Sequence, residues 1–379
     1  MNTTTDNETA ERVPKEMQFE GYGRTDGTVG IRNRVLVLPS VICSHMVADR
    51  IADRVSGAVS ASHDHGCAQM GADNDQTART LVGVARNPNV AGALIVGLGC
   101  EHVQSGPIAD RLSEGGTPVR ETAIQDVGGV DETIDHGENL AEDLVSSADA
   151  DLQPANLSNL TVGVVSSDAT ASTITEAEPV IGSFLDQIVS SGGRAVVAGT
   201  ERVTSHPDAI TSMAGSKDVD MSLTDLANRY KEQPAKLTRR RQRLQDLSAD
   251  KVTQIWGNNP IRDVVPYGES ATHDSGVALV DSPSEFAPAA TALAAAGAQV
   301  IIHATGEGVP TGHPVAPVIK VTGDQSTYAA LSDDIDIDAT TTDAHDLLEY
   351  ILNVVDGDPC RVESHGVTEF AINRVGPSM

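Results

Sequence analysis

The chain has little of several residue types, and each shortage excludes a class of protein. Aromatic residues make up only 3% of its 379 residues, and there are four cysteines. Four cysteines are too few to hold a chain of this length together as a disulfide scaffold. No apolar run approaches the roughly 18 residues that a membrane-spanning helix needs. Residues 1–16 lack the apolar core of a signal peptide, so we expect a disordered tail on a cytoplasmic protein.

Basic residues are scarce as well. Lys and Arg number 26 against 54 Asp and Glu, which gives a net charge of −28. This balance argues against nucleic acid and anionic membranes as partners. A lysine-poor surface with scattered carboxylates is typical of proteins that stay soluble when salt screens charge repulsion. We therefore expect a halophilic source, with an ordinary acidic protein as the alternative.

The length and the apolar pattern predict an α/β fold with two consecutive parallel-sheet, Rossmann-like domains. After the tail, we place an N-terminal domain at 17–155 and a C-terminal domain at 156–379, separated near ADADLQPANLSN. The first is expected to contain strands at 34–39, 58–62, 93–97 and 118–124 and helices at 45–55, 73–85 and 107–113. The second is expected to contain strands at 161–165, 194–198, 277–281, 299–304, 318–321 and 335–337 and helices at 175–190, 222–248, 288–296 and 344–355.

Three cysteines and several polar residues directly follow predicted strands. Cys43 follows the first strand, HDHGCAQ at 63–69 the second, and GLGCEH at 97–102 the third. Loops at the carboxyl ends of parallel strands meet at one edge of the sheet, where ligands bind. The mixed N, O and S donors favour a divalent ion, with Fe²⁺ preferred and Mn²⁺ as the alternative. An iron–sulfur cluster on Cys43, Cys67 and Cys100 stays open, as does the simpler view that these cysteines are small core residues.

Other segments suggest anion binding. GYGRTDGTVGIRNRV at 21–35 carries arginines, which suit carboxylate recognition, and a structural N-terminal hairpin with surface arginines is the alternative. SSDATAS at 166–172 and TGEGVPTGHP at 305–314 follow strands, and their backbone amides can hold an anion. Capping or turn roles are the alternative for both loops, and we expect the arginines at 239–241 to lie on a solvated helix face. No Walker A or G-x-G-x-x-G motif supports a nucleotide cofactor.

The segments GYGRTDGTVGIRNRVLVLPSVICS, HDHGCAQ, NPNVAGALIVGLGCE and IQDVGG follow one another between residues 21 and 129. LTVGVVSSD at 160–168 and ATALAAAGAQVIIHATGEGVPTGHPVAPVIKV at 290–321 continue the pattern. In these segments the chain resembles the large, catalytic part of the altronate and galactarate dehydratases. The resemblance implies a metal-dependent hydro-lyase that converts a sugar acid into a 2-keto-3-deoxy acid.

The resemblance also suggests roles for individual residues. The metal candidates are His65, Cys67 and Cys100. The candidates for proton transfer are Glu101 and His63. The candidates for substrate binding are Arg24, Asp26, Arg32, Asn33, Gln125, Thr305 and Gly306. A separate small subunit, equivalent to the N-terminal domain fused to many relatives, is expected to bind near Arg24–Arg32, and the chain is expected to form homo-oligomers. Replacing Arg24 is then expected to weaken turnover more than folding.

The chain also departs from the family pattern. It has Glu307 where the family usually has arginine, and its 166–172 loop and the segment before Tyr267 differ. Two alternative functions therefore stay open. One is the large subunit of a sulfolactate sulfo-lyase, which releases sulfite in place of water. The other is a catalytically weakened binding or regulatory subunit.

Overall fold

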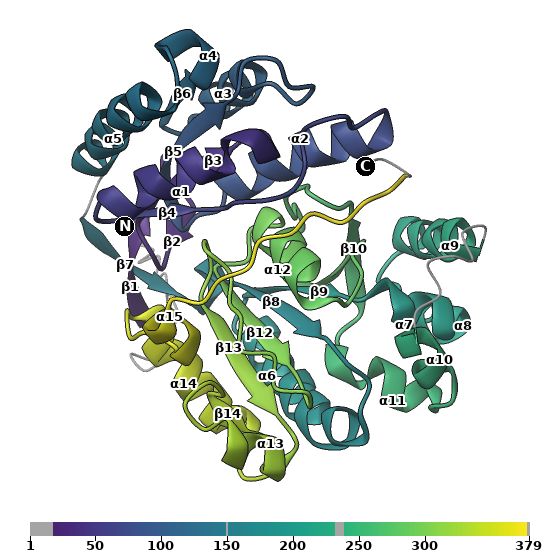
Figure 1. Cartoon of the computed structure of the whole chain (residues 1–379). Helices are drawn as coiled ribbons and strands as arrows, with labels where there is room; N and C mark the ends of the chain where they lie inside the picture. The colour runs from purple at the N-terminus through teal and green to yellow at the C-terminus, as the bar shows by residue number, and fades with distance from the viewer. Residues whose placement is uncertain (1–17, 149–150, 232–238, 377–379) are drawn as a thin grey trace, which may run out of the picture.

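The computed structural model describes residues 18–148, 151–231 and 239–376 (Figure 1). The tail expected at 1–16 lies outside these ranges. The described part folds into three β-sheets and the helices that cover them. None of the helices in these ranges is both long and apolar enough to cross a membrane.

The N-terminal half is built on a four-stranded parallel sheet in the order β4-β3-β5-β6. Its strands are β3 (Arg34–Pro39), β4 (Ala58–Ser60), β5 (Val90–Gly97) and β6 (Val119–Ala123). Its helices are η2 (Ile42–Ser44), α1 (His45–Arg54), α2 (Ala72–Ala85), α3 (Ser105–Glu114), α4 (Ile124–Val127) and α5 (Val130–Ser147). Because successive side chains in a strand point to opposite faces, Val37 packs in the cluster of α1 and α5, and Leu38 packs in that of α2 and α3.

The C-terminal half is built on a seven-stranded parallel sheet in the order β10-β11-β9-β8-β12-β13-β14. Its strands are β8 (Thr161–Ser166), β9 (Arg194–Ala198), β10 (Ile261–Val265), β11 (Gly276–Val280), β12 (Val300–Ala304), β13 (Val318–Thr322) and β14 (Ile337–Asp338). The first helical segments are the π-helix η4 (Thr173–Ala177), α6 (Glu178–Ser190), α7 (Thr200–Ser205), α8 (Pro207–Thr211), α9 (Lys217–Lys231) and α10 (Arg239–Gln245). They are followed by α11 (Ala249–Thr253), η6 (Gln254–Trp256), α12 (Phe286–Ala295), α13 (Gln325–Ala330), α14 (Ala344–Val355) and α15 (Arg361–His365).

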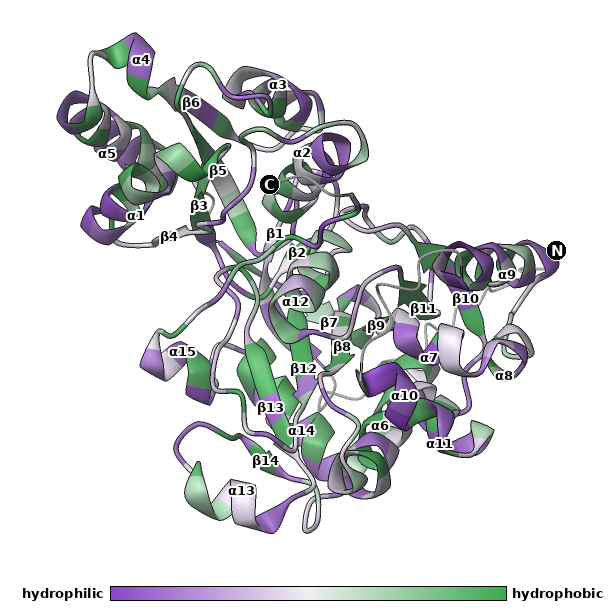
Figure 2. Cartoon of the chain, turned by 45° about the vertical axis from the view of Figure 1, so that its right-hand side comes forward, coloured by the Kyte–Doolittle hydropathy of each residue, from purple (hydrophilic) through white to green (hydrophobic). Residues whose placement is uncertain are grey.

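Helix α12 lies between the two halves, and all ten of its residues are buried. It packs on the larger sheet, of which β12 and β13 form a hydrophobic pair of strands in Figure 2. On its other side it meets α2, where the approach is so close that a Cβ at Gly83 would lie 3.0 Å from the Cβ of Ala295. Ile95 of β5 and Ile301 of β12 therefore belong to one continuous core.

Two further features join the halves. β1 (Gln18–Gly23), β2 (Val29–Gly30) and β7 (Leu152–Asn156) form a small antiparallel sheet in the order β2-β1-β7, and η3 (Leu157–Asn159) follows β7. This sheet pairs the start of the described chain with the connection between the halves. In Figure 1 the last described residues, after α15, run back across the molecule toward the N-terminal half.

The predicted α/β fold with parallel sheets is confirmed. β3, β9 and α14 have the predicted bounds. The hairpin of β1 and β2 corresponds to the alternative for residues 21–35. β7 and the edge strand β10 were not predicted, and the sequence of β10, IRDVV, interrupts its apolar residues with two charges. The predicted polar helix at 222–248 is two helices, α9 and α10, separated by residues outside the described ranges.

Candidate functional site

The carboxyl edge of the four-stranded sheet brings the predicted reactive loops together. The strand order reverses between β3 and β5, because the chain passes from β3 outward to β4 and then returns to the other side of β3. Ligands of open parallel sheets bind at such a reversal. Cys43 follows β3, His63, His65 and Cys67 follow β4, and Cys100 and Glu101 follow β5. The first two loops are in contact, since the Ile42 N–H donates to the His65 carbonyl at 2.8 Å.

Glu101 ties the end of β5 to the end of β3. Its carboxylate accepts from the Ser40 hydroxyl at 2.9 Å, from the Leu98 N–H at 3.2 Å and from the Gly99 N–H at 2.6 Å. Burial acts to raise the pKa of Glu101, but these donors and its own N–H outweigh burial and hold the pKa below its ordinary value. A carboxylate stabilised in this way is a weak proton acceptor, so in this arrangement Glu101 fixes the shape of the loop.

His63 and His65 are buried, with both ring nitrogens of each in hydrogen bonds. His63 Nε2 lies 2.8 Å from the Pro39 carbonyl, and its Nδ1 accepts from the His65 N–H at 3.1 Å. His65 Nε2 lies 2.9 Å from the carbonyl of Ile372, and its Nδ1 lies 3.0 Å from the Gln69 amide nitrogen. A hydrogen bond to a carbonyl requires a proton on Nε2. Each Nδ1 faces an N–H donor and therefore carries no proton, so both rings are neutral. Burial lowers the pKa of His63 to about 4 and also lowers that of His65.

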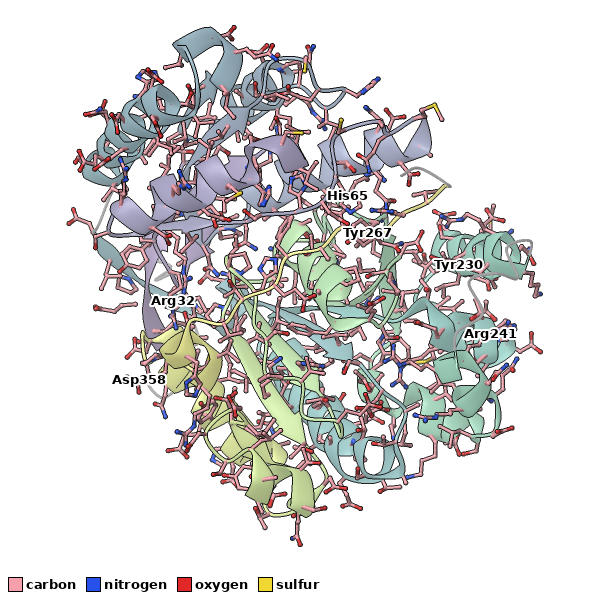
Figure 3. All side chains as sticks on the ribbon, in the orientation of Figure 1. Arg32, His65, Tyr230, Arg241, Tyr267 and Asp358 are labelled. Carbon is pink, nitrogen blue, oxygen red and sulfur yellow. The ribbon has the colours of Figure 1, made fainter. Side chains whose placement is uncertain are left out.

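The C-terminal segment that meets His65 continues along α2. The N–H groups of Val375 and Gly376 donate to Asp73 at 2.6 and 3.0 Å. The Asn373 N–H donates to the Tyr267 hydroxyl at 3.0 Å. Figure 3 shows His65 and Tyr267 beside this segment. The histidine loop is therefore held in place by residues about 300 positions further along the chain.

The three cysteines of this edge, Cys43, Cys67 and Cys100, are exposed, whereas Cys360 is buried. Cys100 Sγ accepts from the Gln125 amide at 3.6 Å, so these two predicted site residues lie together. Gly99 allows this contact, because its φ is +115° and a Cβ there would lie 3.0 Å from Gln125 atoms. The thiols and this amide are the predicted groups that remain accessible at the edge.

The donors of this edge do not form a ready metal site. Across residues 18–148, 151–231 and 239–376, no three His, Cys, Asp or Glu side chains are grouped so that they can hold a metal ion. The hydrogen bonds of His65 also occupy both of its nitrogens. The predicted set of His65, Cys67 and Cys100 therefore does not fit a metal ion in this arrangement.

Arg24 and Asp26 lie at the opposite edge of this sheet. The Arg24 guanidinium donates to the Pro88 carbonyl at 2.7 Å, to Asn33 Oδ1 at 2.9 Å and to the Arg32 carbonyl at 3.0 Å. Pro88 precedes β5, which has eight residues and spans roughly 25 Å at about 3.3 Å per residue. Arg24 and Asp26 line a cavity of about 200 Å³ there, well away from the thiols.

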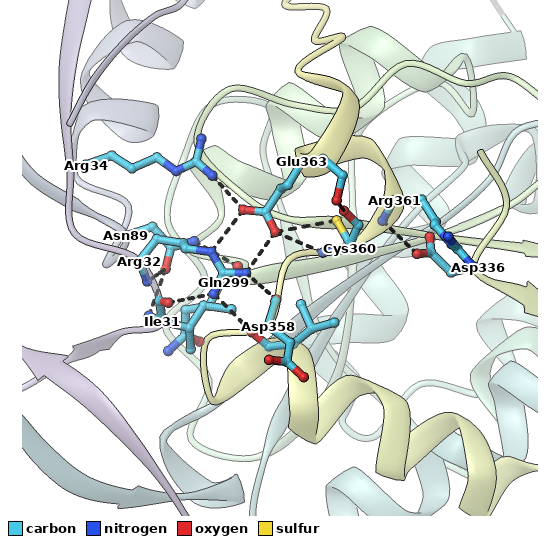
Figure 4. A network of polar contacts seen from close by, with 12 residues as sticks. Ile31, Arg32, Arg34, Asn89, Gln299, Asp336, Asp358, Cys360, Arg361 and Glu363 are labelled. Atoms are coloured by element: carbon cyan, nitrogen blue, oxygen red, sulfur yellow. Dashed lines mark hydrogen bonds and ion pairs between the residues drawn. The ribbon is translucent and has the colours of Figure 1, made fainter. Parts of the chain in front are cut away.

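Arg32 connects the two halves (Figure 4). Its Nε and Nη2 donate to the two carboxylate oxygens of Glu363 at 2.9 and 2.8 Å, and Arg34 donates to the same group at 2.6 Å. Burial acts to raise the pKa of Glu363, but the two arginines outweigh it and lower the pKa. Arg32 therefore already binds a carboxylate, and that carboxylate belongs to the chain itself.

The seven-stranded sheet has its own reversal, between β8 and β12. Asp168 follows β8, and its Oδ2 accepts from the Gly306 N–H at 2.7 Å. Its Oδ1 accepts from the Thr173 hydroxyl at 2.7 Å and from the Thr170 N–H at 3.1 Å. A Cβ at position 306 would lie 2.4 Å from Thr170 Oγ1, so a larger residue there would displace the hydroxyl groups of the 170–173 loop. The backbone amides of these two loops, which were predicted to bind an anion, bind the carboxylate of the buried Asp168. Thr305, next to Gly306, is fully buried.

Sequence reasoning missed Asp168 and Ser40 as residues that organise these edges. The signal for Asp168 was its position directly after a buried strand. The solvated helix face expected for the arginines at 239–241 is wrong for Arg240 and Arg241. Arg241 donates two hydrogen bonds to the Thr204 carbonyl, and Arg240 lies 3.8 Å from Glu201, because α10 packs against α7.

Comparison with known proteins identifies the family. Residues 21–149 match the family described as D-galactarate dehydratase/Altronate hydrolase, second domain, and residues 157–378 match D-galactarate/Altronate dehydratase, C-terminal. The chain belongs to the galactarate/altronate dehydratase family. Named members of this family are dehydratases, which are carbon–oxygen lyases.

Three relatives illustrate the range of this similarity. Altronate dehydratase of Bacillus subtilis is 26% identical over 95% of this chain and 78% of its own length. The (2R)-sulfolactate sulfo-lyase subunit beta of Chromohalobacter salexigens is 28% identical over 95% of this chain and 98% of its own length. Galactarate dehydratase (L-threo-forming) of Escherichia coli is 25% identical over 80% of this chain and 64% of its own length.

Proposed function

We propose that the chain is the large subunit of a hydro-lyase that removes water from a sugar acid such as altronate or galactarate, giving a 2-keto-3-deoxy acid. The observation that carries this proposal is the match of two consecutive dehydratase domains over almost the whole chain. The reversal between β3 and β5 supports the location of the site, because three loops with accessible polar groups meet there.

The helices at this edge favour an anionic substrate. α1 and α3 follow β3 and β5 and have ten residues each, with no acidic residue in the first turn. Helix N-termini carry a partial positive charge and unpaired N–H groups, which stabilise a carboxylate. α2 and α5, further from the reversal, have acidic first turns. Of the helices at this edge, α1 and α3 therefore offer the more favourable N-termini for a substrate carboxylate.

Elimination of water beside a carboxylate requires removal of the α-proton and stabilisation of an enediolate. In our proposal Cys67, Cys100 and Gln125 face the substrate, because they are accessible at the edge. Glu101 and His63 act by holding the loops, since their polar atoms already have partners within the chain. Arg24 and Arg32 then have a structural role, and the substrate carboxylate is bound without them.

Metal dependence remains part of the proposal. A divalent ion, Fe²⁺ or Mn²⁺, would stabilise enediolate charge when bound. The described side chains do not form a site for this ion in the present arrangement. Metal content of the purified active enzyme, measured together with activity after chelation, tests this part. Full activity of the metal-free enzyme would remove the ion from the proposal.

Sulfite release from sulfolactate is the second candidate function. The observation that favours it is the equal extent of this chain and the sulfo-lyase subunit beta, each of which is almost fully covered by the other. The dehydratase relatives are longer, since the alignment covers 78% of one and 64% of another. Both reactions take a hydroxy acid with an α-proton and a leaving group on the β-carbon.

A product assay separates the two candidates. We expect the enzyme to form a 2-keto-3-deoxy acid from altronate or galactarate, detected as a keto acid. Sulfite release from sulfolactate without turnover of sugar acids would establish the second candidate. Turnover of neither class by the complete enzyme would favour the third reading, a binding or regulatory subunit.

The proposal includes an assembly. The relative with the same extent is called subunit beta, which supports a second, smaller subunit for this chain. Homo-oligomerisation, a cytoplasmic location and a high-salt environment complete the proposal. The net charge of −28 supports the last point, and we expect the melting temperature to rise between dilute buffer and molar KCl.

A further inference from the structure

Exposed apolar side chains gather around the carboxyl edge of the four-stranded sheet. Of the eight large hydrophobic residues exposed in the described ranges, five lie on segments at this edge. They are Ile42, Met46, Met70, Val130 and Val375, which we call the apolar rim. Met70 and Met46 are the most exposed of them, at 75% and 58%.

Hydrogen bonds link several of the segments that carry these residues. Ile42 belongs to the loop that bonds to His65. The Met70 carbonyl accepts from the Asp73 N–H, and the Asp73 carboxylate accepts from the Val375 N–H, so the C-terminal segment meets the Met70 loop. Val130 begins α5, five residues after the Gln125 that contacts Cys100.

The rim residues lie on segments at the same edge as three exposed thiols, and this combination is unusual for a free surface. Exposed cysteines are prone to oxidation, and contiguous apolar patches rimmed by polar groups mark interaction sites. An elimination site also has to exclude water to stabilise an enediolate. The edge is open in the chain alone and needs a cover.

The charge of this edge indicates what kind of partner fits it. The loops at 40–46, 62–72, 98–104 and 124–132 contain no Lys or Arg, but they contain Asp64, Asp126, Asp131 and Glu132, all exposed. Arg374 of the C-terminal segment is paired with Asp64 at 3.1 Å. A partner that fits this edge therefore has an apolar centre and a cationic margin. A second copy of this chain, at −28, does not supply such a margin.

We propose that a second, smaller chain docks on the apolar rim and covers the three thiols, bringing a cation that holds the substrate carboxylate. This inference rests on the proposed function and moves the small subunit from Arg24–Arg32, whose arginines bind within the chain, to the opposite edge of the sheet. The length of the partner follows from the relatives. The alignment covers 78% of the Bacillus altronate dehydratase and leaves about 22% of that relative unmatched.

The probe is the protein from the same source organism that is most similar to that unmatched part. Its binding is measured by isothermal titration calorimetry with the wild-type chain, with a Met46→Glu/Met70→Glu variant and with Met221→Glu. Met221 on α9 is the matched control, because it is 56% exposed on a helix of the other half. We expect the rim variant to bind at least tenfold more weakly and Met221→Glu to bind as the wild type does.

Thiol labelling gives a second readout that does not depend on a variant. A maleimide is expected to modify Cys43, Cys67 and Cys100 at least tenfold more slowly when the small chain is bound. Equal binding by the rim variant, or unchanged labelling in the complex, would overturn the docking site. A change in the oligomeric state of the rim variant alone would assign the face to a second copy, which also overturns the proposal.

Turnover of altronate, galactarate and sulfolactate by the wild-type mixture separates this inference from the proposed function. Turnover together with unchanged binding of the rim variant would leave the lyase function in place and remove the docking site. Weakened binding of that variant, with no turnover of any of the three acids, would leave the docking site in place and remove the lyase function.

Discussion

Each half of the molecule has a parallel sheet with a reversal of strand order, and the two halves differ in what occupies that reversal. In the C-terminal half the loops after β8 and β12 are joined by Asp168, which is 4% exposed and accepts hydrogen bonds from the N–H groups of Gly306 and Glu307. In the N-terminal half the loops after β3 and β5 are joined by Glu101, but Cys43 and Cys100 beside it stay exposed. A reversal therefore provides a place for a ligand, and side chains decide whether that place is open.

Replacement of Asp168 is expected to have the largest effect on stability, because its carboxylate joins the loops at the carboxyl edge of the seven-stranded sheet. Asp168→Ala leaves the N–H groups of Gly306 and Thr170 without their carboxylate acceptor and removes one of the two hydrogen-bond partners of the Thr173 hydroxyl. Each unsatisfied buried donor costs about 1–3 kcal/mol, so we expect a loss of about 4 kcal/mol in unfolding free energy. Chemical denaturation measures it.

The matched control for Asp168 is Asp26→Ala on the exposed hairpin of the N-terminal half. Asp26 also accepts from a backbone N–H and a hydroxyl, both of Thr28, but water replaces it there. Equal losses in the two variants would show that the C-terminal edge is not closed by Asp168.

Arg24 tests whether the amino edge of the four-stranded sheet is structural. Arg24→Ala removes bonds to Pro88, Asn33 and Arg32, and we expect it to lower the unfolding free energy by about 2–3 kcal/mol. This reverses the expectation from sequence that turnover would suffer more than folding. Arg54→Ala, which removes exposed ion pairs with Asp135 and Glu138, is the control and should leave the denaturation midpoint unchanged. A fully stable Arg24→Ala enzyme with reduced kcat/KM would restore the substrate-binding role.

Lys320, on β13 of the C-terminal half, is expected to make the stability of the protein depend on pH. It is fully buried, with Nζ 2.8 Å from His303 Nδ1 and 3.9 Å from the centre of the Phe286 ring. Burial lowers its pKa from 10.5 to about 7. Between these values the unfolded chain holds a proton that the folded chain has released, so stability rises with pH and is lost as pH falls toward 7.

The expected contribution of Lys320 is about 1.4 kcal/mol per pH unit within that window. Denaturation at pH 7, 8 and 9 measures the slope, which Lys320→Met should remove and Lys231→Met, at an exposed position, should leave in place. The same slope in all three proteins would mean that Lys320 keeps its ordinary pKa.

The cysteines of the open edge are expected to show the smallest effect on stability. Cys67→Ala and Cys100→Ala should change the unfolding free energy by less than about 0.5 kcal/mol, because both side chains are exposed. Turnover by each variant in the complete enzyme should fall at least tenfold if the cysteine faces the substrate. Cys360→Ala, at a buried position, should show the opposite pattern. Wild-type turnover in both edge variants would place the reactive groups elsewhere.

The sequence by itself determined the fold class, the family and the order of the loops. Alternating apolar strands and helices are local signals, and they placed β3, β9 and α14 correctly. The position of Cys43, Cys67 and Cys100 after successive strands predicted that they share an edge, since parallel strands have a common direction.

Tertiary structure alone decided which polar groups remain available. The partners of His65, Arg32 and Asp168 are Ile372, Glu363 and Gly306, which lie 307, 331 and 138 positions away. No local pattern specifies such pairs, because they form only when distant segments of the chain pack together and each buried polar group has to find a hydrogen-bond partner. His65, predicted as a metal ligand, and Arg32, predicted to bind the substrate, therefore form hydrogen bonds within the chain once it is packed.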